Sequence, residues 1–411
     1  MKFELKDFFI PFLLFLSGIT AKFPIIIIHN AVTYFFAGYC IVTFIYSLIY
    51  KKNIYNKFLV SWIVIWLIWI LISGVNSNYP TLVYMPIIRS FIFFITLLVI
   101  YRYIVSIKRM DYILLSFKYI GIVIALSIII EFGLANFQLF NSHGSLMRYS
   151  GIYSGVNAAG YVISISIIVT FYHWINKKQN NDIYSFIIMF LGMMLTGSRA
   201  ALVLVLFTFL FFFFGKMINK KIFVSAIVFI ISGFLFCLMK FNSILSLLRL
   251  DSGNNGRTEI WESAINVIKE YPIFGCGYGA LQMESIKYLK GDINNLAFQA
   301  TLGNAHNLFL GISAEVGLIG LFILLILLFY VLIKLVNGNQ INKLNSKYNI
   351  YRILLSFFIA FLIRSLFEQN GILSRGAMGI DIYMWIFIVI AIRMKDILKN
   401  ENINNRKSIK L

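Results

Sequence analysis

Charged residues are scarce in this 411-residue sequence, and their scarcity excludes an ordinary soluble domain. Asp, Glu, Lys and Arg make up 13% of the chain, against about a quarter in a typical soluble domain. Hydrophobic residues make up 60%, more than a soluble fold can bury. Cysteines are also few: Cys40, Cys237 and Cys276 show no CxxC spacing, so the sequence indicates neither a disulfide framework nor a zinc site.

Acidic residues are fewer than half as numerous as basic ones, and the net charge is +20. Binding to nucleic acid would need this charge gathered on one soluble face. The basic residues instead lie in short turns between apolar segments, which is typical of a membrane protein. We therefore predict no nucleic-acid partner.

What the sequence does contain is a series of apolar segments long enough to cross a hydrocarbon core about 30 Å thick. They predict an all-α polytopic membrane protein with about twelve transmembrane helices, surrounded by membrane lipids. The first segment lacks a convincing cleavage site and is interpreted as a span rather than a signal peptide. The predicted spans are 8–28, 31–50, 58–74, 81–101, 111–133, 151–174, 183–196, 200–215, 222–240, 305–333, 350–369 and 377–393.

The basic residues also predict the orientation of the bundle, because cytoplasmic loops carry an excess of Lys and Arg. With both termini in the cytoplasm, the short outer connections hold only Arg148, Arg199 and Arg375, whereas every cytoplasmic connection holds at least two basic residues. The chain then divides into transmembrane helices 1 to 9 over residues 1–240, an external loop over 241–304, helices 10 to 12 over 305–393 and a cytoplasmic tail over 394–411.

The long external loop contains a predicted amphipathic helix. Apolar residues recur at helical spacing from Ile260 through Trp261 to Ile268, and the pattern stops before Pro272. We expect this helix to lie over the mouth of the bundle or along the membrane surface. Three glycines follow at 275–279, and because no strand precedes them they indicate a turn rather than a phosphate-binding cradle.

Several ionisable residues fall within predicted spans, where a charge is costly and is therefore a candidate for function. Lys118 lies near an inner span end and is expected to reach the membrane surface. Arginines on the outer side suggest a site for a multiply charged anion, since guanidinium groups bind phosphate in a bidentate manner. Each arginine could instead pair with a carboxylate or anchor a span end. The outer-side candidates are Arg89, Glu131, Arg148, Arg199, Arg257, His306, Glu315, Arg364, Glu368 and Asp381.

Four short motifs follow one another along the second half of the chain. They are RYSGIYSGVN at 148–157, TGSR at 196–199, GRTEIW at 256–261 leading to the glycine turn, and NAHN at 304–307 leading into the next span. In this order, with the last two flanking the long outer loop, they resemble the O-antigen ligase and polymerase family of bacterial membrane proteins. The resemblance covers about residues 145–335.

The resemblance implies transfer of glycans from undecaprenyl pyrophosphate at the outer face of the bacterial cytoplasmic (inner) membrane. A polymerase passes the growing O-antigen or capsule glycan to a sugar hydroxyl of the next lipid-linked repeat unit, and a ligase passes it to lipid A-core. Such a glycosyltransferase would use no nucleotide sugar, metal or other cofactor. Its partners would be the lipid-linked glycan, a chain-length regulator and a flippase.

The resemblance makes His306 and Arg257 the catalytic candidates. His306 would accept the proton of the attacking hydroxyl, and Arg257 would stabilise charge on the departing pyrophosphate. His306 could also be a hydrogen-bonded residue at a span end, and Arg257 a solvated charge opening the loop helix. Glu315 is expected to pair with an arginine, for which Arg364 is the partner to test. The substrate-binding candidates are Arg199, Arg148, Arg89, Asn157, Asn307, Arg364 and Glu315.

Two alternatives to a polymerase stay open. A ligase shares every motif, and we favour the polymerase only because polymerases are more numerous in the family. A flippase for lipid-linked sugars would also have many spans and an arginine-lined cavity, but repeated halves with broken helices are typical of transporters. Here the polar residues instead crowd toward the outer side.

Overall fold

The computed structural model describes residues 7–50, 55–140, 147–214, 257–288, 304–341 and 349–408. These ranges contain thirteen helices and no strand, which confirms the all-α class. The helices are α1 (Phe9–Thr20), α2 (Ile26–Tyr50), α3 (Lys57–Val75), α4 (Pro80–Tyr103), α5 (Ile107–Leu134), α6 (Val156–Lys177), α7 (Asn180–Leu195), α8 (Arg199–Phe214), α10 (Arg257–Glu270), α11 (Leu281–Ile286), α13 (Leu308–Ile341), α14 (Asn349–Arg364) and α15 (Met378–Ser408).

Six of these helices, α2 to α6 and α13, are long and apolar enough to cross a membrane. The helices α1, α7 and α8 are apolar but shorter. The predicted span 222–240 lies outside the described residues, so the count of twelve spans and the full extent of the external loop stay predictions.

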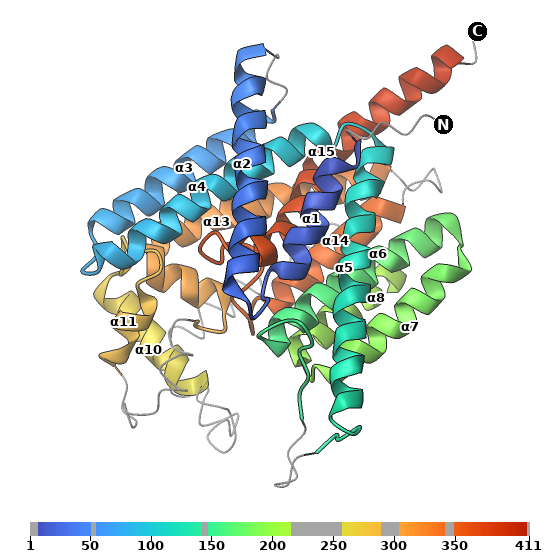
Figure 1. Cartoon of the computed structure of the whole chain (residues 1–411). Coiled ribbons are helices and arrows are strands. Elements are labelled where there is room, and N and C mark those ends of the chain that lie inside the picture. The colour runs from blue at the N-terminus through green and yellow to red at the C-terminus, as the bar shows by residue number, and fades with distance from the viewer. Residues whose placement is uncertain are drawn as a thin grey trace.

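The helices form one bundle, with the loop helices at one end (Figure 1). Within the bundle α8 packs on α14, α5 packs on α6 and α7, and α13 packs on α3. The helices α10 and α11 lie at the end opposite to the start of α1 and the end of α15 (Figure 1). This places the described part of the predicted external loop on the side away from both terminal helix ends.

The first two predicted spans have different bounds in the structure. The predicted span 8–28 is the shorter helix α1, and α2 begins at Ile26 rather than at residue 31. Pro24 lies in the turn between them, where it lacks a backbone N–H and disfavours helical geometry in the residue before it. The helix boundary therefore falls where Lys22 and Pro24 interrupt the apolar run.

Lys118 does not reach the membrane surface, so that prediction is wrong. Its side chain is buried, and Nζ lies 2.6 Å from Asp182 Oδ1 on α7. The aspartate, near the start of the neighbouring helix, supplies a partner inside the bundle that the sequence position of Lys118 alone does not reveal.

The helix α13 is broken near its start. Val316 and Gly317 have non-helical backbone angles, and Gly317 has φ +73°. The carbonyl groups freed by the break accept hydrogen bonds from Ser73 Oγ (to Glu315 O, 3.1 Å) and from Trp69 Nε1 (to Val316 O, 2.8 Å). Satisfying backbone groups in this way is what allows irregular structure at membrane depth.

Replacing Gly317 with alanine is expected to destabilise the protein by about 3 kcal/mol or more, because a left-handed backbone is unfavourable for alanine and its Cβ would meet backbone atoms. A Cβ at this position would lie 1.9 Å from Ile273 O. Gly38→Ala is the matched control, since nothing lies within 4 Å of its Cβ and alanine favours a helix. Thermal unfolding in detergent should show a much lower midpoint for Gly317→Ala and an unchanged midpoint for Gly38→Ala. Equal midpoints would contradict the expected backbone strain and Cβ clash at position 317.

Candidate functional site

The first two motifs lie side by side at one end of the bundle. Arg148 Nε donates a hydrogen bond to Thr196 O at 3.0 Å, and Tyr149 N donates one to Leu195 O at 3.1 Å. The turn between α7 and α8 therefore holds the segment that precedes α6. Residues about fifty positions apart in the sequence form one surface here.

A chain of polar side chains then connects the first motif to the fourth. Arg148 Nη2 donates to Asn157 Oδ1 at 2.7 Å, and Asn157 Nδ2 donates to Glu368 Oε1 at 3.1 Å. The other oxygen of Glu368, Oε2, lies 3.4 Å from His306 Nδ1. We call Arg148, Asn157, Glu368 and His306 the outer polar cluster. It joins three of the predicted site residues through a buried carboxylate.

Hydrogen bonds to the backbone of His306 and of the residue before it hold this position in place, and His306 N itself donates to Asn304 Oδ1 at 2.9 Å. Trp261 Nε1 on α10 donates to Ala305 O at 2.9 Å, and Ala305 N donates to Gln369 Oε1 at 2.9 Å. His306 itself has φ +48°, an uncommon conformation for a residue with a side chain. Strained residues of this kind concentrate at functional sites, and here the neighbouring contacts impose the geometry.

Asn307 acts as the N-cap of α13. Its Oδ1 accepts hydrogen bonds from Phe309 N at 2.9 Å and Leu310 N at 3.1 Å, and its Nδ2 donates to Leu366 O at 3.1 Å. The side chain therefore satisfies backbone groups at the start of α13. Substrate binding by Asn307 stays a prediction.

Glu315 pairs with an arginine as expected, but the partner is Arg375 rather than Arg364. Arg375 Nε donates to Glu315 Oε1 at 2.8 Å, and its Nη2 contacts the same oxygen. Arg364 instead donates from Nη1 to Asn370 O at 2.6 Å and lies over the ring of Tyr161, 4.2 Å from its centroid. The non-helical turn between α14 and α15 brings Arg375 to the break in α13. Helical periodicity does not predict this placement of Arg375.

The other arginine candidates lie outside the hydrogen-bonded cluster. Arg89 and Arg199 are exposed, and the described part of the chain shows no hydrogen bond or ion pair for either. Gly376, next to Arg375, packs against the backbone of Arg89, which places that part of α4 beside the Arg375 turn. Arg257 is the first residue of α10, and its side chain lies outside the described residues.

The predicted loop helix is confirmed as α10. Ile260, Ala264, Ile265 and Ile268 are buried, and α10 packs against α13. The glycines at 275–279 all have positive φ and form a turn, as expected. Within this turn Cys276 N donates to Ala314 O and Gly277 N to Glu315 O, both at 2.9 Å, so the loop completes the backbone bonding of the α13 break.

A carboxylate docks the loop onto the turn between α3 and α4. Glu284 is 1% exposed; it accepts hydrogen bonds from Asn78 Nδ2 and Tyr79 Oη, both at 3.3 Å, and forms an ion pair with Lys287. Burial alone would raise the pKa of Glu284. The hydrogen bonds and the charge of Lys287 outweigh burial, so the pKa of Glu284 is lowered.

Glu284→Gln is expected to weaken this docking by about 1–3 kcal/mol, because the buried carboxylate loses charge-assisted hydrogen bonds. Since the folded pKa is lowered, the wild-type contribution is present above the unfolded pKa of about 4.3 and disappears as the pH falls through the folded value. Hydrogen exchange over residues 271–288 should increase in the variant at pH 7 and in the wild type in acid. Glu259→Gln, at an exposed position of α10, is the control: it should leave hydrogen exchange over residues 271–288 as in the wild type, both at pH 7 and in acid.

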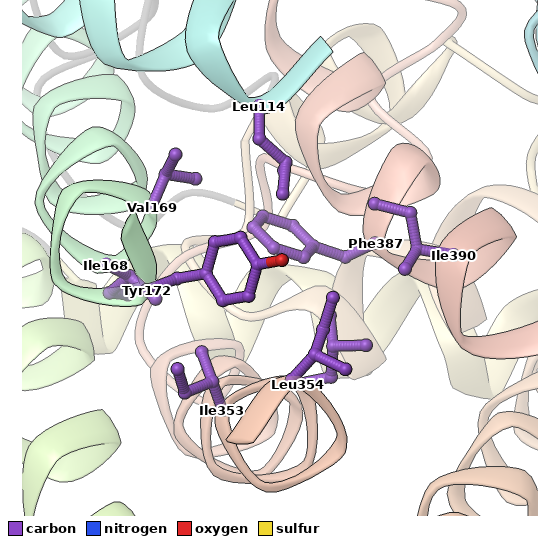
Figure 2. A pocket seen from close by; sticks show the side chains of 9 residues that line it. Leu114, Ile168, Val169, Tyr172, Ile353, Leu354, Phe387 and Ile390 are labelled. Atoms are coloured by element: carbon purple, nitrogen blue, oxygen red, sulfur yellow. The ribbon is translucent and has the colours of Figure 1, made fainter. Parts of the chain in front are cut away.

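An apolar cavity elsewhere offers no comparable chemistry. Figure 2 shows it between α5, α6, α14 and α15, with Leu114, Ile168, Leu354 and Phe387 among its lining residues. Its one polar lining group is the hydroxyl of Tyr172, which donates to Asp111 Oδ1 at 3.3 Å. This cavity lacks the groups that would bind a charged or sugar substrate.

Sequence reasoning did not assign a role to four residues that build the site: Glu368, Arg375, Trp261 and Gln369. Glu368 and Arg375 were visible as rare charges near outer span ends, but their partners are 60 or more residues away in the sequence. Trp261 was interpreted only as part of an apolar helix face. Its indole nitrogen gains a second role because α10 packs beside the start of α13.

The fold and the site define a helical membrane protein whose outer polar cluster, at one end of the bundle, contains an arginine and a histidine–carboxylate pair. Residues 184–325 match the family model described as O-antigen ligase, which confirms the resemblance over that stretch. The matched range contains the second motif, α10, the glycine turn and His306. An uncharacterised protein of Haemophilus influenzae is 26% identical over 214 residues, covering 46% of this chain and 53% of the relative. The match therefore spans about half the length of that relative.

Proposed function

We propose that the protein is a polysaccharide polymerase that transfers a glycan from undecaprenyl pyrophosphate to a sugar hydroxyl of another lipid-linked repeat unit. The observation that carries this proposal is the outer polar cluster, in which family motifs distant in sequence converge on His306. The family match supports the class of reaction, transfer of a lipid-linked glycan within a membrane. The product would be O-antigen or capsule.

In the proposed reaction His306 acts as the general base. Glu368 Oε2 lies beside Nδ1, so its charge favours a proton on that nitrogen and leaves Nε2 as the acceptor. The acceptor hydroxyl loses its proton to Nε2 as its oxygen bonds to the anomeric carbon of the donor. The bond from that carbon to the pyrophosphate breaks, and the electron pair leaves with the pyrophosphate. Direct attack inverts the anomeric configuration.

Cationic side chains would stabilise the charge that develops on the pyrophosphate. Arg148 is exposed and belongs to the outer polar cluster, and Arg199 begins α8 directly after the turn that Arg148 contacts. We assign these two arginines, with Arg257 and Arg89, to the diphosphate and the adjoining sugars. No metal takes part in this scheme.

The proposed site faces the outer side of the bacterial cytoplasmic membrane, with both termini in the cytoplasm. The support is that the cluster and α10 lie at the bundle end away from the start of α1 and the end of α15 (Figure 1). Cysteine substitution at Asn304 and at Asn176, next to opposite ends of the bundle, can test this orientation with a membrane-impermeant thiol reagent in intact cells. Labelling at position 176 alone would contradict the proposed orientation.

The decisive experiment is incubation of the purified protein with one defined lipid-linked repeat unit. A ladder of longer lipid-linked products, with release of undecaprenyl pyrophosphate, is the expected result. Product formed only after addition of lipid A-core would instead identify a ligase, the activity named by the family model. Movement of the substrate across a vesicle without new bonds would identify a flippase, for which the broken helix α13 is the structural argument.

A further inference from the structure

A pocket with arginines in its lining lies between α1, α2, α4 and α5, at the end of the bundle opposite to the outer polar cluster. Arg102, Tyr103 and Arg109 line it together with Thr43 and Ser47 of α2. Its volume is about 810 Å³ including the open mouth. None of these residues belongs to the outer polar cluster or to the family motifs.

The pocket is formed at helix ends, where lipid headgroups are expected. Arg102 is in the last turn of α4, Arg109 is in the first turn of α5, and Ser47 is close to the end of α2 at Tyr50. Because helix ends mark the boundary between hydrocarbon and water, polar groups from three helix ends meet here at the membrane interface.

The two arginines of the pocket differ in how their charge is balanced. Arg109 is neutralised by Asp7: its Nη2 lies 2.7 Å and its Nε 2.9 Å from Asp7 Oδ1. Arg102 Nη1 is buried and has no hydrogen-bond partner in the described part of the chain. The guanidinium of Arg102 lies 5.8 Å from the ring centroid of Tyr55, a contact that leaves its N–H donors free. A buried cationic donor without a partner is costly, so an anionic acceptor would be strongly favoured there.

The apolar part of the pocket lining is suited to acyl chains. The apolar or aromatic side chains of Ile10, Tyr39, Tyr46 and Val99 line the pocket together with its polar groups, and Tyr46 of α2 is 53% exposed. A ligand with a phosphate in the pocket could thus place hydrocarbon against α2. This combination favours a phospholipid over a free anion or a soluble partner.

We propose that this pocket binds the phosphate headgroup of an anionic glycerophospholipid, with Arg102 as the main phosphate ligand and the apolar part of the pocket lining against the start of the acyl chains. The site is independent of the proposed glycan transfer, since it lies at the other end of the bundle and shares no residue with it.

Native mass spectrometry of the full-length, delipidated protein in detergent tests this proposal. The probes are phosphatidylglycerol, phosphatidylcholine with the same acyl chains, and inorganic phosphate. We expect the wild type to retain phosphatidylglycerol about five- to tenfold better than phosphatidylcholine, because a charge-assisted contact discriminates between the two. Arg102→Gln should remove that preference. Lys334→Gln removes the same charge near the same end of the bundle, outside the pocket, and should keep it.

A variant that fills the pocket without removing a charge tests whether the lipid preference depends on the pocket itself. Thr43→Trp would fill the pocket while keeping both arginines, and it should also abolish the preference for phosphatidylglycerol. Arg102→Lys keeps a charge and should retain part of the preference. Equal retention of both lipids by the wild type, an unchanged preference in Arg102→Gln and Thr43→Trp, or displacement of the lipid by millimolar inorganic phosphate would each overturn the proposal.

Discussion

Replacing His306 with alanine is expected to lower the rate of glycan transfer by about 10²–10⁴-fold, because the acceptor hydroxyl loses its general base. Hydrogen bonds hold the backbone of Ala305 before His306, and Asn307 after it caps α13, so the fold around His306 should persist without its side chain. The measurement is the initial rate of polymer formation from a defined lipid-linked repeat unit, with protein amounts matched in the membrane.

His173→Phe is the matched control for His306→Ala. His173 is buried in α6 toward the opposite end of the bundle, neither of its ring nitrogens makes a hydrogen bond in the described residues, and phenylalanine keeps a planar ring there. Its transfer rate should stay near the wild-type value. Full-length glycan made by His306→Ala at normal protein levels would remove His306 from the catalytic role.

Glu368→Gln separates the charge of the carboxylate from its shape. The amide can still contact Asn157 but no longer favours a proton on His306 Nδ1. We expect a rate loss of about 10–100-fold, smaller than for His306→Ala, since orienting partners of this kind affect activity through the residue that they hold. The double variant should be no worse than His306→Ala, because the two residues act as one unit.

Arg375→Gln is expected to cost about 3–5 kcal/mol of stability, because it leaves the buried Glu315 carboxylate without its partner. Glu315→Gln is expected to cost less, since the side chain of Arg375 is 29% exposed. Glu315 is 0% exposed, and Arg375 reaches it from the turn between α14 and α15. Glu315→Gln and Arg375→Gln should each lower the midpoint of thermal unfolding in detergent. The double variant should be more stable than the sum of the two single losses implies, which is the signature of direct coupling.

Arg364→Gln is the control for this comparison of single and double variants. Arg364 is buried, and its described contacts are with Asn370 O and the Tyr161 ring rather than with Glu315. Its loss should therefore add to the loss from Glu315→Gln, with a coupling below about 0.5 kcal/mol. Coupling of Glu315 to Arg364 rather than to Arg375 would contradict the geometry of the α13 break.

Local sequence patterns predicted the helices well but not all of their ends. The predicted first span 8–28 is interrupted by Lys22 and Pro24, and the structure places both in the turn that separates α1 from α2. The break in α13 was not predicted either. Glu315, Gly317 and Gly320 interrupt the apolar run there, but only the approach of the glycine turn and of α3 supplies the hydrogen bonds that a non-helical backbone needs.

The candidate site was predictable in its parts. The types of residue, their outer position and their motifs pointed to His306, Arg148 and Asn157, and the structure joins these three through Glu368. Glu368 and Arg375 were not assigned because their partners come from other helices. Periodicity describes which residues share one helix face, but it contains no information on which two helix ends will meet.

The sequence by itself determined that this protein is a helical membrane protein with an amphipathic loop helix, because hydropathy and spacing depend on nearest neighbours along the chain. Only the tertiary structure decided that Glu315 pairs with Arg375, that Lys118 pairs with Asp182, and that a carboxylate stands behind His306. A buried charge takes whichever partner the packing of the bundle brings within reach, and that choice depends on residues far apart in the sequence.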